Sequence, residues 1–263
     1  MTRSHKHYRR WTEKGKNVDH FDTTRRLYKN IVKPLIRYSR RRRIDILLDY
    51  VSGKSVLDLG CVEHESKIEK KRDWWLHGLI KKRARSLRGV DCDGEAVKDL
   101  QQQGYNICVA DVENMDLREK GYDVIMAGEL FEHLTNHRSF LECVKRHLAP
   151  NGVFVASMPN ANSLNYFMQT LVFGHEVDAW DHAAFFTPVT ITVMLNKCGF
   201  TPTEIVLYQP DEIYHHANRL HKLLAFIFNR LQQVVCWLRP SLARGLIVVA
   251  KSSVAVVGTK NNT

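Results

Sequence analysis

Several short apolar runs in this chain carry an acidic residue or a glycine at their ends, and these residue types can hold a polar ligand. The first run contains Asp58 and is followed by Gly60 and Cys61. An acidic group and a tight turn at this place face the crevice where open α/β sheets bind ligands, and glycine lets the backbone approach closely. The second run ends in Asp91, followed by Cys92. The Asp91 carboxylate can accept hydrogen bonds from both hydroxyls of a ribose.

The third and fourth runs continue this pattern. Asp111 and Val112 follow the third run and offer a polar and an apolar group, which suits the edge and the face of an adenine ring. Gly128 ends the fourth run. The four runs together predict a nucleoside ligand at one edge of a sheet.

A second group of candidate residues follows Gly128 directly. Glu129, Glu132 and His133 have the spacing Glu-x-x-Glu-His, and His182 stands later in the chain. Two carboxylates and two imidazoles that converge at a strand-to-helix turn can bind a divalent cation and leave positions for substrate oxygens. Without a metal, His133 or His182 is the natural general base, because histidine titrates nearest to neutral pH.

These candidates need a scaffold, and the hydrophobic pattern indicates one. Strands are expected at Ser55–Leu59, Leu87–Asp91, Asn106–Ala110, Tyr122–Ala127, Gly152–Met158, Glu204–Tyr208 and Leu246–Val249. Helices are expected at Ile68–Arg83, Gly94–Gln103, Arg138–Leu148 and Thr187–Lys197. Strands that alternate with helices are typical of βαβ units. We therefore expect one doubly wound, Rossmann-like α/β domain with helices on both faces of the sheet.

The order of these motifs, together with the turn Pro150-Asn151-Gly152, resembles the class I S-adenosylmethionine-dependent methyltransferases over about residues 50–252. The resemblance implies a seven-stranded sheet whose last strand is antiparallel, and transfer of a methyl group from a sulfonium to a nucleophile. It also implies which residues bind the cofactor. Asp58, Gly60 and Cys61 would line its methionine and ribose end, and Asp91 would hold the ribose with Cys92 beside it. Asp111 and Val112 would bracket the adenine, and Gly128 would meet the methionine moiety.

One loop departs from that family. Further glycine usually follows the position of Cys61, whereas this chain has Val62-Glu63-His64-Glu65. The segment between Asp58 and Asp91 is also long, so no contacts are carried over to residues 62–65. A dinucleotide-binding enzyme is the rival interpretation of a glycine turn before a helix, but the glycines of the G-x-G-x-x-G fingerprint are absent.

The pattern at residues 129–133 is similar to that of the ubiquinone-biosynthesis O-methyltransferases and the small-RNA 3′-end 2′-O-methyltransferases. In those families it binds, with a distant histidine, a divalent metal that holds two neighbouring hydroxyls. The resemblance implies Mg²⁺ or Mn²⁺ at Glu129, Glu132, His133 and His182. The alternative is that Glu-His-Leu is only a fold signature, with His133 packing or positioning substrate.

Charge is distributed very unevenly along the chain. Residues 1–43 contain 15 Lys/Arg and 3 Asp/Glu, while the other residues carry 24 and 25. The run Arg40–Arg43 could face phosphates, anionic lipid or an acidic substrate, or it could be a solvated helix face. Apolar residues recur at helical spacing over Thr23–Tyr50, with Pro34 as the break. We interpret residues 1–50 as a basic arm with cap helices, 51–252 as the methyltransferase domain and 253–263 as a tail.

Residues 211–242 form an apolar and basic insertion between the last two strands. Arg219, Lys222, Arg230 and Arg239 leave too short an uncharged run for a transmembrane helix. The insertion could be a helix packed over the sheet, a substrate lid or an interfacial membrane helix.

The amino-acid composition excludes some classes of protein and indicates a cellular compartment. With 44% hydrophobic and 25% charged residues, the chain is neither wholly disordered nor fibrous. Six cysteines without a C-x-x-C pair, and a first apolar stretch that follows a basic segment, predict a cytoplasmic protein. The basic arm and the apolar insertion together favour an amphiphilic or anionic acceptor that is met by peripheral contact with a membrane surface. We expect S-adenosylmethionine-dependent O-methylation of a small or lipid-linked hydroxyl acceptor. An RNA 2′-O-methyltransferase and a non-catalytic cofactor-binding protein are the alternatives.

Overall fold

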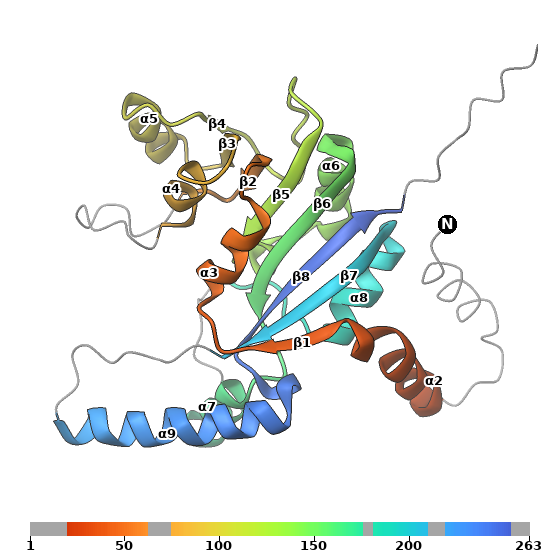
Figure 1. Ribbon diagram of the computed structural model, residues 1–263, viewed down its shortest axis with the longest axis vertical. Helices are drawn as coiled ribbons and strands as arrows, with labels where there is room; N and C mark the ends of the chain where they lie inside the picture. Colours follow the sequence, from red (N-terminus) through yellow and green to blue (C-terminus); the bar gives the residue numbers. More distant parts are fainter. Residues whose placement is uncertain (1–19, 63–74, 176–180, 210–218, 254–263) are drawn as a thin grey trace, which may run out of the picture.

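The computed structural model describes residues 20–62, 75–175, 181–209 and 219–253, and an open twisted sheet lies at its centre (Figure 1). The sheet has eight strands in the order β1-β7-β8-β6-β5-β2-β3-β4. The strands are β1 (Ile36–Ser39), β2 (Ser55–Leu59), β3 (Ser86–Asp91), β4 (Ile107–Val109), β5 (Tyr122–Gly128), β6 (Leu148–Pro159), β7 (Phe200–Tyr208) and β8 (Gly245–Ser252). Strand β8 is antiparallel to both of its neighbours, whereas the other pairs are parallel. The expected Rossmann-like fold with a reversed last strand is confirmed.

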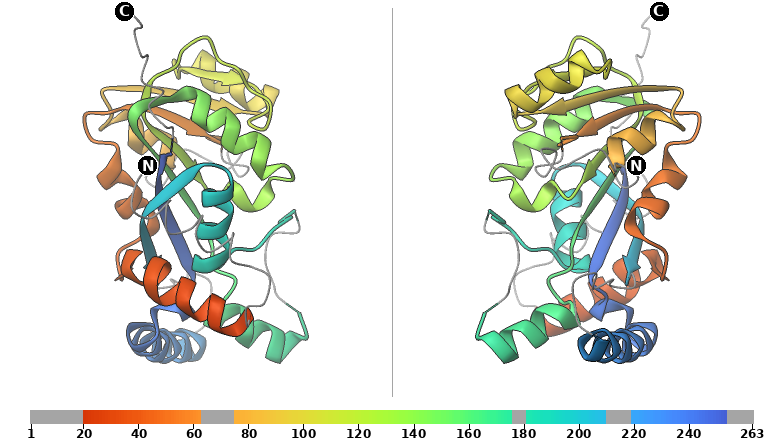
Figure 2. Two further views of the ribbon diagram at one scale, coloured as in Figure 1. Left: turned by 90° about the vertical axis from the view of Figure 1, so that its right-hand side faces the viewer. Right: turned by 90° about the vertical axis from the view of Figure 1, so that its left-hand side faces the viewer.

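Helices cover both faces of this sheet (Figure 2). They are α2 (His20–Leu27), α3 (Arg43–Leu47), α4 (Leu76–Lys81), α5 (Gly94–Gln102), α6 (His137–His147), α7 (Leu164–Phe173), α8 (Pro188–Lys197) and α9 (Arg219–Leu238). Side chains alternate along β5, as they must in a strand. Val124 and Met126 belong to the core under α3 and α4, while Ile125 and Ala127 belong to the core under α6 and α8. No helix among the described residues is long and apolar enough to cross a membrane.

The N-terminal segment differs from the helical prediction for residues 23–50. A π-helical turn (Tyr28–Val32) and a 3-10 turn (Lys33–Leu35) follow α2, and the chain then extends as β1. Ile36 pairs in parallel with Ile205 of β7. Since Pro34 ends the helix and β-branched and aromatic residues follow it, the segment covers the edge of β7 that would otherwise stay open. The sheet therefore gains an eighth strand beyond the seven implied by the family resemblance.

Other differences concern the borders of elements. The helix expected over Ile68–Arg83 is described only as α4, because residues 63–74 lie outside the described part of the chain. Helix α7 was not expected, and Ser163 caps it by accepting a hydrogen bond from the backbone N–H of Tyr166. The insertion between the last two strands contains the 20-residue helix α9. Most of the expected arm (1–19) and tail (254–263) also lies outside the described residues.

Gly89 on β3 offers a direct test of this packing. A methyl group there would stand 2.6 Å from Cys61 Sγ, 2.8 Å from His77 Cε1 and 2.9 Å from Ile107 Cγ1. We predict that Gly89→Ala lowers the free energy of unfolding by about 1–3 kcal/mol, since overpacking a full core costs this much. Urea denaturation measures the change.

Gly94, the first residue of α5, is the matched control. A Cβ added at Gly94 would have Val109 Cγ2 as its nearest neighbour, at 4.0 Å. Gly94→Ala should therefore leave the free energy of unfolding unchanged or raise it by up to about 1 kcal/mol. Equal losses in the two variants would contradict the packing described for β3.

Candidate active site

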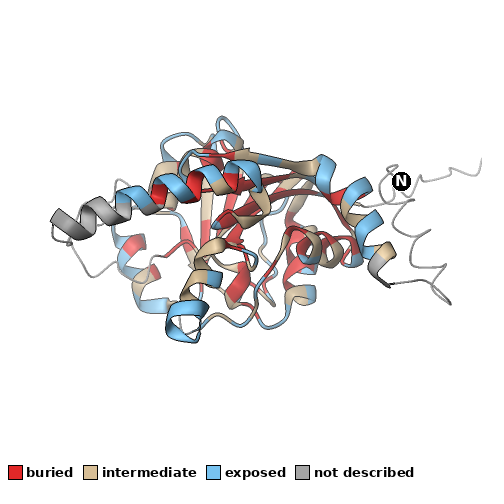
Figure 3. Cartoon of the chain, turned by 90° about the horizontal axis from the view of Figure 1, so that it is seen from below, coloured by how far each residue is buried: buried red, intermediate tan, exposed pale blue. Residues whose placement is uncertain are grey.

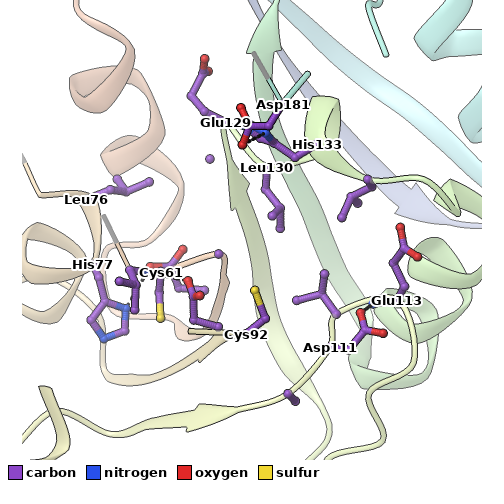
Figure 4. Close-up of a pocket in the computed structure, with 18 of the residues that line it drawn as sticks. Cys61, Leu76, His77, Cys92, Asp111, Glu113, Glu129, Leu130, His133 and Asp181 are labelled. Atoms are coloured by element: carbon purple, nitrogen blue, oxygen red, sulfur yellow. Dashed lines mark hydrogen bonds and ion pairs between the residues drawn. The ribbon is translucent and has the colours of Figure 1, made fainter. Parts of the chain in front are cut away.

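A cavity of about 530 Å³ opens at the carboxyl ends of the parallel strands (Figure 4). Its walls come from the segments that follow β2, β3, β4 and β5, on both sides of the place where the strand order reverses. The structure brings all the residues predicted to bind the cofactor to this cavity: Asp58, Gly60, Cys61, Asp91, Cys92, Asp111, Val112 and Gly128. The volume is in the range of small-molecule sites.

Two glycines keep the floor of the cavity open. Gly60 has a φ of +66°, and a Cβ there would lie 2.9 Å from Leu130 Cδ1. A Cβ on Gly128 would lie 2.8 Å from Leu76 Cδ2 and 3.3 Å from Arg43 Nη1. Larger residues at either position would therefore disturb the wall, and at Gly60 they would also strain the backbone.

The loop after Gly60 is held from the side of α4. His77 Nδ1 lies 2.9 Å from Asp58 Oδ2, and both side chains are buried. The indole Nε1 of Trp75 donates a hydrogen bond of 2.9 Å to the carbonyl of Cys61. The His77 and Trp75 contacts thus tie the start of α4 to Asp58 and to the backbone of Cys61. Residues 63–65 lie outside the described part.

Backbone amides orient the acid at the end of β3. Asp91 Oδ2 accepts the N–H of Val62 at 2.9 Å, and Oδ1 accepts the N–H of Asp93 at 3.0 Å. Each carboxylate oxygen has further lone pairs, so Asp91 can also accept hydrogen bonds from a ligand. Asp111 is fixed similarly, because Oδ1 accepts the N–H of Glu113 at 2.9 Å.

The cavity is strongly acidic. Its carboxylates are Asp58, Asp91, Asp111, Glu113, Glu129 and Asp181. Arg43 is the sole Lys or Arg among its described lining residues. The guanidinium donates to Ser157 Oγ at 3.1 Å and lies 3.6 Å from Glu129 Oε1. Burial raises the pKa of the Cys61 thiol, so this group stays neutral.

Sequence analysis missed Arg43 as a site residue. It belongs to the run Arg40–Arg43, and nothing in four identical residues indicates which one turns inward. Trp75, His77 and Asp181 were also not assigned to the site. Their spacing follows no motif, and only the fold places them at the cavity.

A second cavity of about 180 Å³ adjoins the first and shares Glu129 and His133 with it. Ligand atoms of Glu132, His133 and His182 lie within 4.8 Å of one another on its wall. The structure thus groups three of the four residues predicted to hold a metal. Glu129 stays outside the group, because its Oε1 accepts the Ser157 hydroxyl at 2.9 Å and lies near Arg43.

The backbone of Glu129 has a φ of 53°, an unusual value for a residue other than glycine. Its N–H donates to the carbonyl of Ser157 at 3.0 Å, so the neighbouring strand β6 holds this conformation in place. Strained residues of this kind concentrate at functional sites. Here the turn sends the chain from the end of β5 into the Glu132–His133 segment.

Asp181 orients the imidazole of His133 (Figure 4). Its Oδ2 lies 3.1 Å from His133 Nδ1. A proton assigned to Nδ1 for this contact leaves Nε2 as the basic nitrogen. One carboxylate and two imidazoles form a donor set that suits a divalent cation, and a second carboxylate behind a ligating histidine is usual at such sites.

Tyr208 lies deeper in the wall of the second cavity. Burial raises the pKa of this phenol well above its ordinary value. Tyr208 therefore remains a neutral hydroxyl and is no candidate for the general base.

Comparison with known proteins agrees with this geometry. The family model described as a methyltransferase domain matches residues 35–205. The chain belongs to the methyltransferase-domain family. Its domain is that of an S-adenosylmethionine-dependent methyltransferase.

Two curated ubiquinone biosynthesis O-methyltransferases are similar to this chain at low identity. The chain is 26% identical over 172 residues to the ubiquinone biosynthesis O-methyltransferase of Psychrobacter arcticus, covering 59% of this chain and 62% of that protein. It is 23% identical over 185 residues to the human mitochondrial ubiquinone biosynthesis O-methyltransferase, covering 62% of this chain and 46% of that protein. The matched region thus spans less than two thirds of these relatives.

The fold is similar to that of an S-adenosylmethionine-dependent methyltransferase from Archaeoglobus fulgidus, with a TM-score of 0.52 and 18% identity. That match covers 89% of this chain and 100% of the other. A chain in the complex of the Haloferax volcanii Trm112 methyltransferase activator with a methyltransferase gives a TM-score of 0.54 at 15% identity, covering 80% and 88%. At these identities the likeness concerns the fold.

Arg43→Met should weaken binding of S-adenosylhomocysteine by about 10-fold or more, because a hydrogen bond to a charged group contributes about 1.5–3 kcal/mol. The expected partner is the cofactor's carboxylate, the anionic group that an otherwise acidic cavity would repel. Calorimetric titration measures the affinity.

The neighbouring Arg42 supplies a matched control. Its side chain is exposed and pairs with Asp45 at 2.8 Å, away from the cavity. Arg42→Met should bind the cofactor product as the unchanged protein does. Equal affinities for all three proteins would remove Arg43 from the binding site.

Proposed function

We propose that this protein transfers the methyl group of S-adenosylmethionine to a hydroxyl oxygen of a small or lipid-linked acceptor. The observation that carries the proposal is the position of the Glu132–His133–His182 cluster. It lies on the wall of a second cavity that adjoins the large one and shares Glu129 and His133 with it. A hydroxyl held at this junction meets both a proton acceptor and the methyl donor.

The volume and the charge of the large cavity support its assignment to the cofactor. Gly60 and Gly128 open its floor, and the Asp91 carboxylate, which two backbone amides hold in place, has further lone pairs for the hydroxyls of a ribose. The acidic lining complements the cationic centres of S-adenosylmethionine, while Arg43 complements its carboxylate. When bound, the cofactor supplies an activated methyl group on a sulfonium.

The cluster prepares the acceptor. His133, oriented by Asp181, presents Nε2 toward a hydroxyl proton or a metal. Glu132, His133 and His182 would hold a divalent cation, whose charge favours the ionised form of a nearby hydroxyl. Since Glu129 stands apart from the group, the remaining set has two imidazoles and one carboxylate. Imidazole is a poor ligand for the hard Mg²⁺ ion, so this set favours a transition-metal ion such as Mn²⁺ over Mg²⁺.

Within the described part of the basic segment, Arg41, Arg42 and Arg43 are engaged in contacts inside the protein. Arg41 pairs with Asp49 at 2.6 Å, Arg42 pairs with Asp45, and Arg43 points into the cofactor cavity. Phosphate binding needs cationic groups that are free to neutralise the backbone. These intramolecular contacts favour a small or lipid-linked acceptor over RNA.

Glu132→Gln tests the proposed chemistry. We predict that catechol-like acceptors are methylated by the unchanged protein, that EDTA abolishes turnover and that Mn²⁺ restores it. The variant should lose about 100-fold or more in turnover, because acceptor deprotonation contributes at least this much. Methyl ether products are measured by mass spectrometry, and S-adenosylhomocysteine affinity should be unchanged.

Glu142→Gln on the exposed side of α6 is the matched control and should keep full turnover. Turnover that is insensitive to EDTA would contradict the metal and leave His133 as the base. Absence of any methyl ether, with cofactor binding intact, would contradict O-methylation.

A further inference from the structure

Helix α9 is amphipathic, but its polar side faces the domain and its apolar side faces outward. Its inward side carries Asn229, Gln232 and Gln233, which are all buried, together with buried Cys236. Its outward side carries large apolar residues at helical spacing, and they are exposed: Phe226, Ile227, Leu231, Val234, Trp237 and Leu238. In Figure 3 buried and exposed residues alternate along this helix. A helix that only packs on the domain would bury the apolar side instead.

Polar contacts hold α9 in this orientation. Gln232 donates to Asn165 of α7 and accepts a hydrogen bond of 3.2 Å from Gln209 after β7. Gln233 accepts a hydrogen bond from the guanidinium of Arg40. These buried amides are satisfied by specific partners, so the inward side of α9 is fixed by hydrogen bonding. The apolar side is thereby directed to the outside.

Helix α7 extends the same exposed surface. It lies beside α9 beyond the ends of the strands (Figures 1 and 2) and contacts it through the Gln232–Asn165 hydrogen bond. Four of its apolar residues are exposed: Phe167, Leu171, Val172 and Phe173. We name these four residues together with the six exposed residues of α9 the α7–α9 surface. Apolar patches of this kind on a protein surface mark interaction sites.

We propose that the α7–α9 surface docks on an anionic lipid bilayer. Helix α9 and the Arg239 that follows it contain four Lys/Arg and no Asp/Glu. Arg230 lies on the outward side, with its guanidinium 5.0 Å from the centroid of the Phe226 ring. A basic segment beside large apolar residues and an exposed tryptophan is what an interfacial helix presents to acidic headgroups. A symmetric contact between two copies would instead bring these positive charges together.

This docking would place the active site at the bilayer. Asn165, Tyr166 and Gln169 of α7 line the second cavity, while Phe167 and Leu171 of the same helix belong to the α7–α9 surface. One helix thus forms both the cavity wall and part of the docking surface. This step rests on the proposed function, because it gives a lipid-linked acceptor a direct path from the bilayer to the Glu132–His133–His182 cluster.

Vesicle sedimentation tests the docking directly. The full chain is mixed with vesicles of phosphatidylcholine alone or with added phosphatidylglycerol, without cofactor or acceptor. We expect binding to the anionic vesicles, weakened by added salt through screening. The double variant L231N/W237Q, which changes residues 62% and 68% exposed, should lower the partition coefficient by about 10-fold or more.

Val109→Asn provides the matched control, since Val109 on β4 is 55% exposed at the far edge of the sheet. It should bind vesicles as the unchanged protein does. All variants should keep the same affinity for S-adenosylhomocysteine, which shows that they are folded.

Equal vesicle binding by L231N/W237Q would overturn the proposal, and so would binding that does not depend on phosphatidylglycerol. A dimer that light scattering detects and the double variant dissociates would assign the surface to a second copy. If the unchanged protein binds anionic vesicles but methylates no hydroxyl acceptor, the result would count against the proposed function alone.

Discussion

The reversal of strand order between β2 and β5 is the constraint on which the site depends. Chain segments leave this place in opposite directions, so the loops after β2 and β5 diverge and a cavity opens between them. Because all the neighbouring strands there are parallel, their carboxyl ends bring Asp58, Asp91, Asp111 and Gly128 to one edge. The Glu132–His133 segment follows β5 directly and therefore enters the same region.

The candidate active site and the proposed docking surface differ in how far the family model covers them. The family model covers residues 35–205, which include the whole lining of the large cavity and all of the second cavity's lining except Tyr208 and Arg244. Helix α9 lies beyond that range and is attached through amide hydrogen bonds to α7, to Gln209 and to Arg40. Under the two proposals made above, the common domain supplies the chemistry and α9 determines where the chemistry takes place. Helix α7 joins the two because its residues belong to both.

Local patterns in the sequence predicted the parts of the fold that depend on neighbouring residues. Alternation of short apolar runs with helical segments indicated the doubly wound sheet, and acids at strand ends indicated the cavity. Contacts that join distant segments were not predictable in this way. The His77–Asp58 pair and the position of Arg43 beside Gly128 depend on how α3 and α4 pack, and no motif encodes this. The strand β1 was missed because its pairing with β7 overrides the helical spacing around it. For α9 the periodicity predicted an amphipathic helix. The apolar side of such a helix usually packs on the domain, whereas in α9 the apolar side is exposed.

Calorimetric titration of the full chain with S-adenosylhomocysteine tests most directly the claim that the cavity at the β2–β5 reversal is a cofactor site. The account predicts saturable binding at a single site per chain, in the presence of either Mn²⁺ or EDTA, because none of the three clustered ligands is among the residues predicted to bind the cofactor. Absence of binding under both conditions, from a protein that unfolds cooperatively, would contradict it.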